Sequence, residues 1–200
     1  MADSLSDADV LEELKQWKVN RPSKPSRLLP KSGFGGPADR SYTLKNGKVR
    51  KFLQHEEQSV GINLGWTDDA EPSTAAKVAR WFFARSGASD KPLVYGETLA
   101  IGNGGSPSFI RNKKRTAGVD LDWSTTPVFE WKLVGGEPGT TIDPADYLAI
   151  YNEKAGEFLI FFNRTAGGDI GWPSSKTWGE QIPDVVVEKA KKRAEKILLG

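Results

Sequence analysis

The chain contains no cysteine and only one histidine, His55. The lack of cysteine excludes disulfides, thiolate metal sites and cysteine nucleophiles, and it favours a reducing compartment. The first ten residues, MADSLSDADV, have neither the basic stretch nor the apolar stretch of a secretory signal, and no run approaches the ~20 apolar residues of a membrane-spanning helix. These absences predict a cytoplasmic protein without a transmembrane segment; release without a classical signal is the alternative.

The net charge is also low, at +2, because 28 basic residues are offset by 26 acidic ones. This balance is too small to create a general field for nucleic acids or membranes. The sequence has no P-loop, dinucleotide-binding fingerprint, HExxH pair or GxSxG elbow, and its histidine lies in a predicted hairpin tip. We therefore predict that the protein is not an enzyme and uses no cofactor or metal.

What the chain does contain is seven tryptophans and 21 glycines, a composition that favours short strands and turns. Three 16-residue segments align without gaps, and each ends in tryptophan with a glycine five positions earlier. They are KFLQHEEQSVGINLGW (51–66), SFIRNKKRTAGVDLDW (108–123) and EFLIFFNRTAGGDIGW (157–172). A match this dense in three places predicts an internal repeat.

Each copy reads as four short strands. The first is aliphatic, with LAI in the second and third copies, and the second is centred on Phe-Leu or Phe-Ile. The third alternates so that its tryptophan lies on the apolar face, which predicts a core position. The fourth alternates Phe129, Trp131 and Leu133 on one face, and its counterparts are residues 81–83 and Trp178.

About twelve such strands can close on themselves, with six in a barrel and six in three capping hairpins, and closure removes exposed sheet edges. The repeated Phe followed by Leu or Ile, then Gly-x-Asp/Asn-Leu/Ile-x-Trp and an aromatic strand, resembles the β-trefoil superfamily over residues 38–183. The resemblance implies an all-β domain with repeats at about 38–90, 91–140 and 141–183. Fascin-like actin-binding repeats, ricin-B-type lectins, growth-factor cytokines and Kunitz-type inhibitors share this architecture. The Gln-x-Trp signature of ricin-B lectins is absent, so their sugar site is not transferred.

Two helices are predicted outside the repeats. Residues 6–17 offer Ser6 as an N-cap, acids in the first turn and apolar residues at helical spacing. A basic, proline-rich strap follows, so residues 1–37 form an N-terminal helix and an extended connector. Residues 184–200 predict a C-terminal helix with an apolar and a basic face. Each helix is expected to pack on the outside of the trefoil; the alternative is a partner protein or a membrane surface, since the other face of the C-terminal helix is basic.

The candidate binding residues lie on polar strand positions and at hairpin tips. Asn63, Asp120 and Asp169 point away from the apolar face, where they can bind sugar hydroxyls, water or turn backbone, or a cation if they gather near the axis. The tips differ most between the copies, which favours specialised contacts there. The second tip is basic and the third is aromatic, and their candidate residues are Arg111, Lys113, Lys114, Phe161 and Phe162. The aromatic pair either packs beneath an end extension or forms an apolar recognition contact.

These features predict a non-enzymatic recognition module. The first hypothesis is a lectin-like module that binds a glycan or glycoprotein in shallow pockets between hairpins, with polar side chains on the hydroxyls and an exposed aromatic on the pyranose ring. The alternative is a cytosolic protein-interaction module of the cytoskeletal, actin-binding type, which the lack of cysteine and signal peptide favours. A protease inhibitor with a projecting loop at 68–78 or 134–146 is a third hypothesis.

Overall fold

The computed structural model describes residues 12–20, 41–67, 77–87, 91–106, 108–116, 118–161, 163, 167–173 and 192. These residues are predominantly β, which confirms the predicted class. Their strands are β1 (Trp17–Asn20), β2 (Thr43–Asn46), β3 (Leu53–His55), β4 (Leu64–Trp66), β5 (Trp81–Ala84), β6 (Thr98–Asn103), β7 (Ser108–Asn112), β8 (Leu121–Ser124), β9 (Trp131–Val134), β10 (Ala149–Asn152), β11 (Glu157–Phe161) and β12 (Ile170–Gly171). A short 3-10 turn, η1 (Lys77–Ala79), leads into β5.

Six of these strands follow one another in a ring of antiparallel neighbours. The ladders are β1–β2, β5–β6, β6–β9 and β9–β10. Two bridges complete the ring: Tyr42, just before β2, pairs with Trp81 of β5, and Leu148, just before β10, pairs with Trp17 of β1. The second bridge has two backbone hydrogen bonds of 2.9 and 2.8 Å. Each ring strand is thus paired on both sides.

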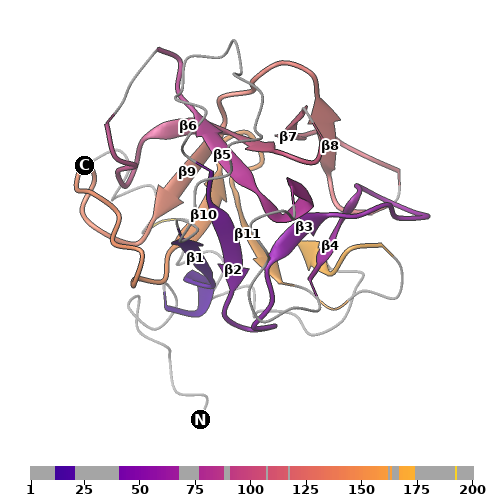
Figure 1. Cartoon of the computed structure of the whole chain (residues 1–200), viewed down its shortest axis with the longest axis horizontal. Coiled ribbons are helices and arrows are strands. Elements are labelled where there is room, and N and C mark those ends of the chain that lie inside the picture. The colour runs from indigo at the N-terminus through magenta and orange to yellow at the C-terminus, as the bar shows by residue number, and fades with distance from the viewer. Residues whose placement is uncertain are drawn as a thin grey trace.

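The other six strands form three antiparallel hairpins, β3–β4, β7–β8 and β11–β12. In Figure 1 the first two of these hairpins lie together on the right of the ring strands. Each hairpin contains one copy of the 16-residue repeat, and each has a glycine at positive φ before its second strand: Gly61 (93°), Gly118 (92°) and Gly167 (81°). That backbone conformation explains why the repeat keeps glycine at this position.

A fully buried tryptophan opens each of β1, β5 and β9 and joins the ring to a hairpin. Its indole N–H donates to a backbone carbonyl in the first strand of that hairpin. The three bonds are Trp17 to Leu159 (2.6 Å), Trp81 to Leu53 (2.8 Å) and Trp131 to Ile110 (2.8 Å). The same polar contact therefore occurs once in each repeat, in the interior, where an unpaired indole N–H would be costly.

Each of these tryptophans also stacks on a tryptophan that ends a repeat segment. The ring centroids are 5.9 Å apart for Trp17–Trp66, 6.5 Å for Trp81–Trp123 and 6.2 Å for Trp131–Trp172. Trp172 is buried, whereas Trp66 and Trp123 are half-buried and pack against the core. The prediction that the repeated tryptophans serve packing is confirmed by these contacts, although two of them keep some exposure.

The N-terminal segment departs from the predicted helix. Residues 12–14 form one helical turn, but residues from Trp17 onward form β1, which lies in the ring. Trp17 rather than Trp178 occupies the position equivalent to Trp81 and Trp131, so the third repeat is closed by a strand from the beginning of the chain. The β body therefore includes residues 17–20, N-terminal to its predicted start at 38. Trp178 and, apart from Lys192, the predicted helix over 184–200 lie outside the described residues.

The fourth strand of the second repeat, which corresponds to β9, also begins later than expected. Phe129 was expected to share a buried face with Trp131 and Leu133, but it is 39% exposed and precedes β9. Glu130 is buried in its place. The alternation holds for Trp131, Lys132 and Leu133, which are buried, half-buried and buried, and Val134 after them is also buried.

Candidate functional site

Two of the three recurrent polar side chains hold the turns of their own hairpins. The Asn63 side-chain oxygen accepts the Gln58 N–H at 3.2 Å, and Asp120 Oδ1 accepts the Arg115 N–H at 2.8 Å. Both bonds span five residues and close the hairpin loop. Asp169 is half-buried at the equivalent position of the third hairpin. The three residues thus belong to three separate hairpins, and at least two of them have a structural role in the loop backbone.

Phe161 lies at a junction between the third hairpin, the first hairpin and the N-terminal segment. Its ring meets Trp66 edge-on at a centroid distance of 5.8 Å, and its backbone N–H donates to Gln16 Oε1 at 2.9 Å. This environment matches the interpretation in which the aromatic tip packs beneath an end extension. Phe162, the second aromatic candidate, lies outside the described residues.

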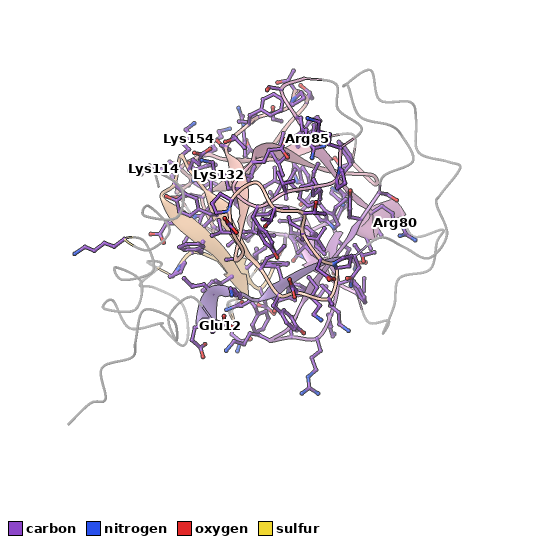
Figure 2. The ribbon with its side chains drawn as sticks, turned by 90° about the vertical axis from the view of Figure 1, so that its left-hand side faces the viewer. Glu12, Arg80, Arg85, Lys114, Lys132 and Lys154 are labelled. Carbon is purple, nitrogen blue, oxygen red and sulfur yellow. The ribbon has the colours of Figure 1, made fainter. Side chains whose placement is uncertain are left out.

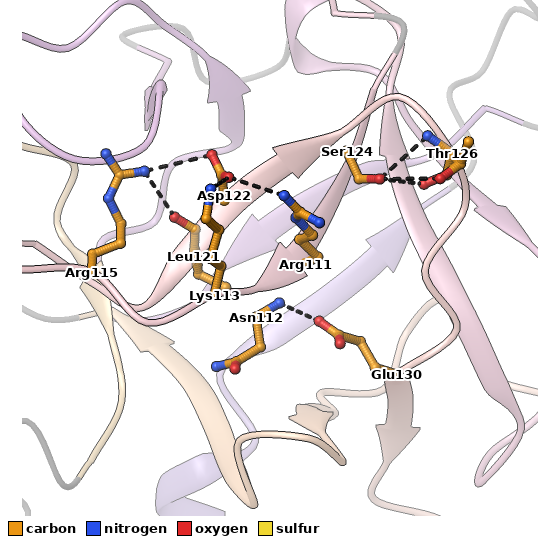
Figure 3. Close-up of polar contacts among 9 residues, drawn as sticks. All are labelled: Arg111, Asn112, Lys113, Arg115, Leu121, Asp122, Ser124, Thr126 and Glu130. Carbon is orange, nitrogen blue, oxygen red and sulfur yellow. Dashed lines mark hydrogen bonds and ion pairs between the residues drawn. The ribbon is translucent and has the colours of Figure 1, made fainter.

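The basic candidates form a compact ion cluster on the second hairpin, residues 108–124, which we call the basic hairpin. Arg111 Nη2 and Lys113 Nζ both contact Asp122 Oδ2, at 3.4 and 2.8 Å, and Arg115 Nη1 lies 3.6 Å from Oδ1 (Figure 3). Arg111 is the direct cross-strand neighbour of Asp122 in the β7–β8 ladder. Lys114 is exposed and lies at the edge of the body in Figure 2.

The carboxylate at the centre of this cluster is held in its charged form. Burial alone would raise the pKa of Asp122, but hydrogen bonds from Lys113, the Trp123 backbone and Arg111 outweigh it, so the pKa lies below its ordinary value. Asp122 therefore remains an anion beneath the cations at any pH near neutrality. The second repeat is the only one of the three segments with acid at this strand position, since its counterparts are Gly65 and Gly171.

A second carboxylate, that of Glu130, contacts the backbone of the basic hairpin at Asn112. Glu130 is buried and accepts a hydrogen bond from the Asn112 backbone N–H (Figure 3). It accepts a second hydrogen bond from Asn152 Nδ2 at 3.0 Å. The backbone carbonyl of Glu130 also accepts the N–H of Glu153 at 2.8 Å. The base of the hairpin is thus attached to the ring strands by a charge-assisted contact, which fixes where the cations stand.

Sequence reasoning missed Glu130, although one regularity in the chain points to it. Gln16, Arg80 and Glu130 each precede a ring tryptophan, and each is buried. Each backbone carbonyl accepts an N–H, at 2.7–2.8 Å, from the turn that comes after the next ring strand along the chain. A polar residue before each of Trp17, Trp81 and Trp131 is visible in the sequence, but three different side chains do not indicate burial. Only the repeated environment shows that the position belongs to the interior.

The first hairpin lies beside the basic hairpin and carries the opposite charge. The His55 ring lies 5.5 Å from that of Trp123, so the two hairpins are in contact. Glu56 is the counterpart of Lys113 in the aligned segments, and its carboxylate accepts a hydrogen bond from Gln54 at 3.2 Å. The positive surface is therefore confined on this side by acidic residues.

Across the part of the chain that the structure describes, no group of three or more His, Asp or Glu side chains is placed to hold a metal ion. In the same residues, no helix has the length and apolar character needed to cross a membrane. A scan against protein-family models and searches of curated proteins and solved structures gave no significant match.

Proposed function

We propose that the body is a β-trefoil and that it acts as a non-enzymatic recognition module for acidic glycans, with the basic hairpin as the binding surface. The trefoil is supported by the ring of six paired strands, the three hairpins and the threefold recurrence of tryptophan contacts. A closed β body with variable hairpin tips presents specificity on the tips, since the strands are required for packing.

The observation that carries the proposal is the local charge of the basic hairpin. Four cations at 111–115 and two carboxylates at 120 and 122 give it a charge of +4 − 2 = +2, which equals the net charge of the whole chain. The rest of the chain therefore sums to zero, although it contains other basic stretches, such as residues 19–40, that acidic residues elsewhere offset. Positive side chains on a rigid hairpin are suited to the sulfate and carboxylate groups of acidic sugars.

A glycan fits this surface better than a nucleic acid does. The acidic first hairpin, through Glu56 and Glu57, limits the positive footprint on one side, and a duplex backbone would extend across it. Phe129, 39% exposed and adjacent to the Glu130 that supports the hairpin, offers an aromatic face for a sugar ring. A short acidic oligosaccharide can use both features within a small contact area.

The test is binding of the full chain to an array of sulfated, uronic and neutral oligosaccharides, followed by titration at two salt concentrations. We expect binding to the sulfated or uronic members that weakens as salt rises, because exposed charges are screened within about 10 Å at 0.1 M. Lys113→Glu with Lys114→Glu reverses the hairpin charge from +2 to −2 and should abolish binding. The control Lys154→Glu lies on the exposed turn after β10 and should retain binding; it is compared with Lys114→Glu alone, so that both variants change the net charge by two units.

Two results would contradict the proposal. One is the absence of binding to every acidic oligosaccharide on the array. The other is an equal loss in the Lys154→Glu control, which would mean that net charge rather than the hairpin governs the interaction. Titration with a single-stranded and a double-stranded DNA oligomer is included, and tighter binding to either would reassign the surface to nucleic acid.

A further inference from the structure

Asp122 is the least exposed member of the ion cluster on the basic hairpin. Its side chain is 24% exposed, against 37% for Arg111, 57% for Lys113 and 31% for Arg115. The carboxylate therefore lies beneath the three cations rather than beside them. Arg111 and Lys113 each use one donor on Asp122, and Arg115 pairs with it at 3.6 Å. A guanidinium has five donors and an ammonium three, so each cation keeps further donors for a ligand, although Arg111 Nε is buried.

The shared carboxylate also limits how far apart two of the cations can be. Arg111 Nη2 is 3.4 Å and Lys113 Nζ 2.8 Å from the same oxygen, so these nitrogens are at most 3.4 + 2.8 = 6.2 Å apart. Arg115 is held on the other oxygen and also donates to the Leu121 carbonyl at 3.2 Å. Long cationic side chains on an exposed hairpin would otherwise separate, both by mutual repulsion and to regain rotamer freedom.

We propose that Asp122 is a positioning residue that preorganises Arg111, Lys113 and Arg115, and that it selects sugars with closely spaced sulfate groups over sugars whose carboxylates alternate with neutral rings. This inference rests on the proposed function of the basic hairpin. Cations at most 6.2 Å apart engage one sulfate or two neighbouring ones together, whereas widely separated carboxylates engage them singly. Preorganisation raises affinity because the ordering of these side chains precedes binding.

Charge alone and positioning predict opposite effects for Asp122→Asn. The substitution raises the charge of the basic hairpin from +2 to +3, so a purely electrostatic surface would bind acidic ligands more tightly. If Asp122 orders the cations, the variant binds a densely sulfated hexasaccharide about tenfold more weakly, because three long side chains must be ordered on binding. Its affinity for an unsulfated hexasaccharide with alternating uronates changes little, so the selectivity between the two ligands falls.

The experiment is calorimetric titration of the full chain with both hexasaccharides, comparing wild type, Asp122→Asn and Glu137→Gln. Glu137→Gln adds the same unit of positive charge at an exposed position outside the basic hairpin. Circular dichroism and a thermal melt establish that each variant is folded. Nitrogen-15 relaxation of the Arg111 and Arg115 side chains gives a readout that needs no ligand, and we expect both to be ordered in wild type and mobile in Asp122→Asn.

The outcomes separate the two proposals. Weaker and less selective binding by Asp122→Asn, with Glu137→Gln unchanged or slightly tighter, supports the positioning role. Equal or tighter binding of the sulfated ligand by Asp122→Asn, or arginine side chains that are equally mobile in both proteins, overturns it while leaving the proposed function intact. Absence of wild-type binding to both hexasaccharides overturns the proposed function and this inference with it.

Discussion

Replacement of Trp17 by phenylalanine tests whether the N-terminal strand is an integral part of the β body. The variant loses the 2.6 Å hydrogen bond to the buried carbonyl of Leu159, and an unsatisfied buried carbonyl costs about 1–3 kcal/mol. The smaller ring also leaves a cavity beneath Trp66. Since full truncation of a buried aromatic costs about 3–5 kcal/mol, this partial loss contributes about 1–2 kcal/mol. We expect a total of about 2–5 kcal/mol, a large share of the stability of a typical domain.

The measurement is urea unfolding followed by far-ultraviolet circular dichroism, applied in parallel to Trp17→Phe, Trp81→Phe and Trp131→Phe. Because the three indoles make the same contacts, the three losses should agree within about 1 kcal/mol, the usual spread for one interaction in different surroundings. The sequence alone assigned this position to Trp178, so Trp178→Phe is the discriminating comparison. If Trp178→Phe is as destabilising as Trp81→Phe while Trp17→Phe costs less than about 0.5 kcal/mol, the closure by β1 is refuted.

Two further predictions concern buried polar groups. Asn152→Ala removes the 3.0 Å hydrogen bond to Glu130 and the hydrogen bond that caps the turn at Ala155, so a thermal melt should show a loss of about 2–4 kcal/mol in stability. The control Asn163→Ala, at an exposed position, should change stability by no more than about 0.5 kcal/mol. Equal losses in the two variants would contradict the structural role of Asn152. Burial, followed by the nearby carboxylates of Asp146 and Asp143, raises the pKa of Tyr95, so its stabilising contribution is complete below the ordinary tyrosine pKa of about 10 and is lost as pH rises through the higher folded value. Absorbance titration at alkaline pH should show one tyrosine of wild type, absent in Tyr95→Phe, that ionises later in the folded than in the urea-unfolded chain, and coincident curves would refute this.

The hairpins of the fold could be predicted because they are local. Phe52, Phe109 and Phe158 mark the first strand of each hairpin, and the Gly-x-Asp/Asn-x-x-Trp spacing marks the second strand. Each hairpin joins residues that are close in the chain, so a repeated sequence of 16 residues contains most of its determinants. For the same reason, the roles of Asn63 and Asp120 in the loop backbone were among the alternatives visible in the sequence.

The closing strand could not be predicted because Leu14, Trp17 and Val19 satisfy two periodicities. In the sequence, Leu14 and Trp17 have helical spacing, whereas Trp17 and Val19 have strand spacing, and all three are buried. Tertiary pairing decides in favour of the strand, because β1 pairs with β2 on one side and Trp17 pairs with Leu148 on the other. Asp122 was missed for a similar reason. Its meeting with Arg111 depends on the register of β7 and β8, and a shift of one residue would turn it to the other face.

The entry of β1 into the ring has a consequence for biosynthesis. Trp17 leaves the ribosome well before its hydrogen-bond partner Leu159, which is 142 residues farther along the chain. At translation rates of about 5–20 residues per second, this partner is made roughly 7–30 seconds later. During that interval β1 can already pair with β2, while the edge of β1 that Leu148 covers in the finished body remains open to other strands. Nascent chains of this protein are therefore expected to need protection by chaperones until the third repeat emerges.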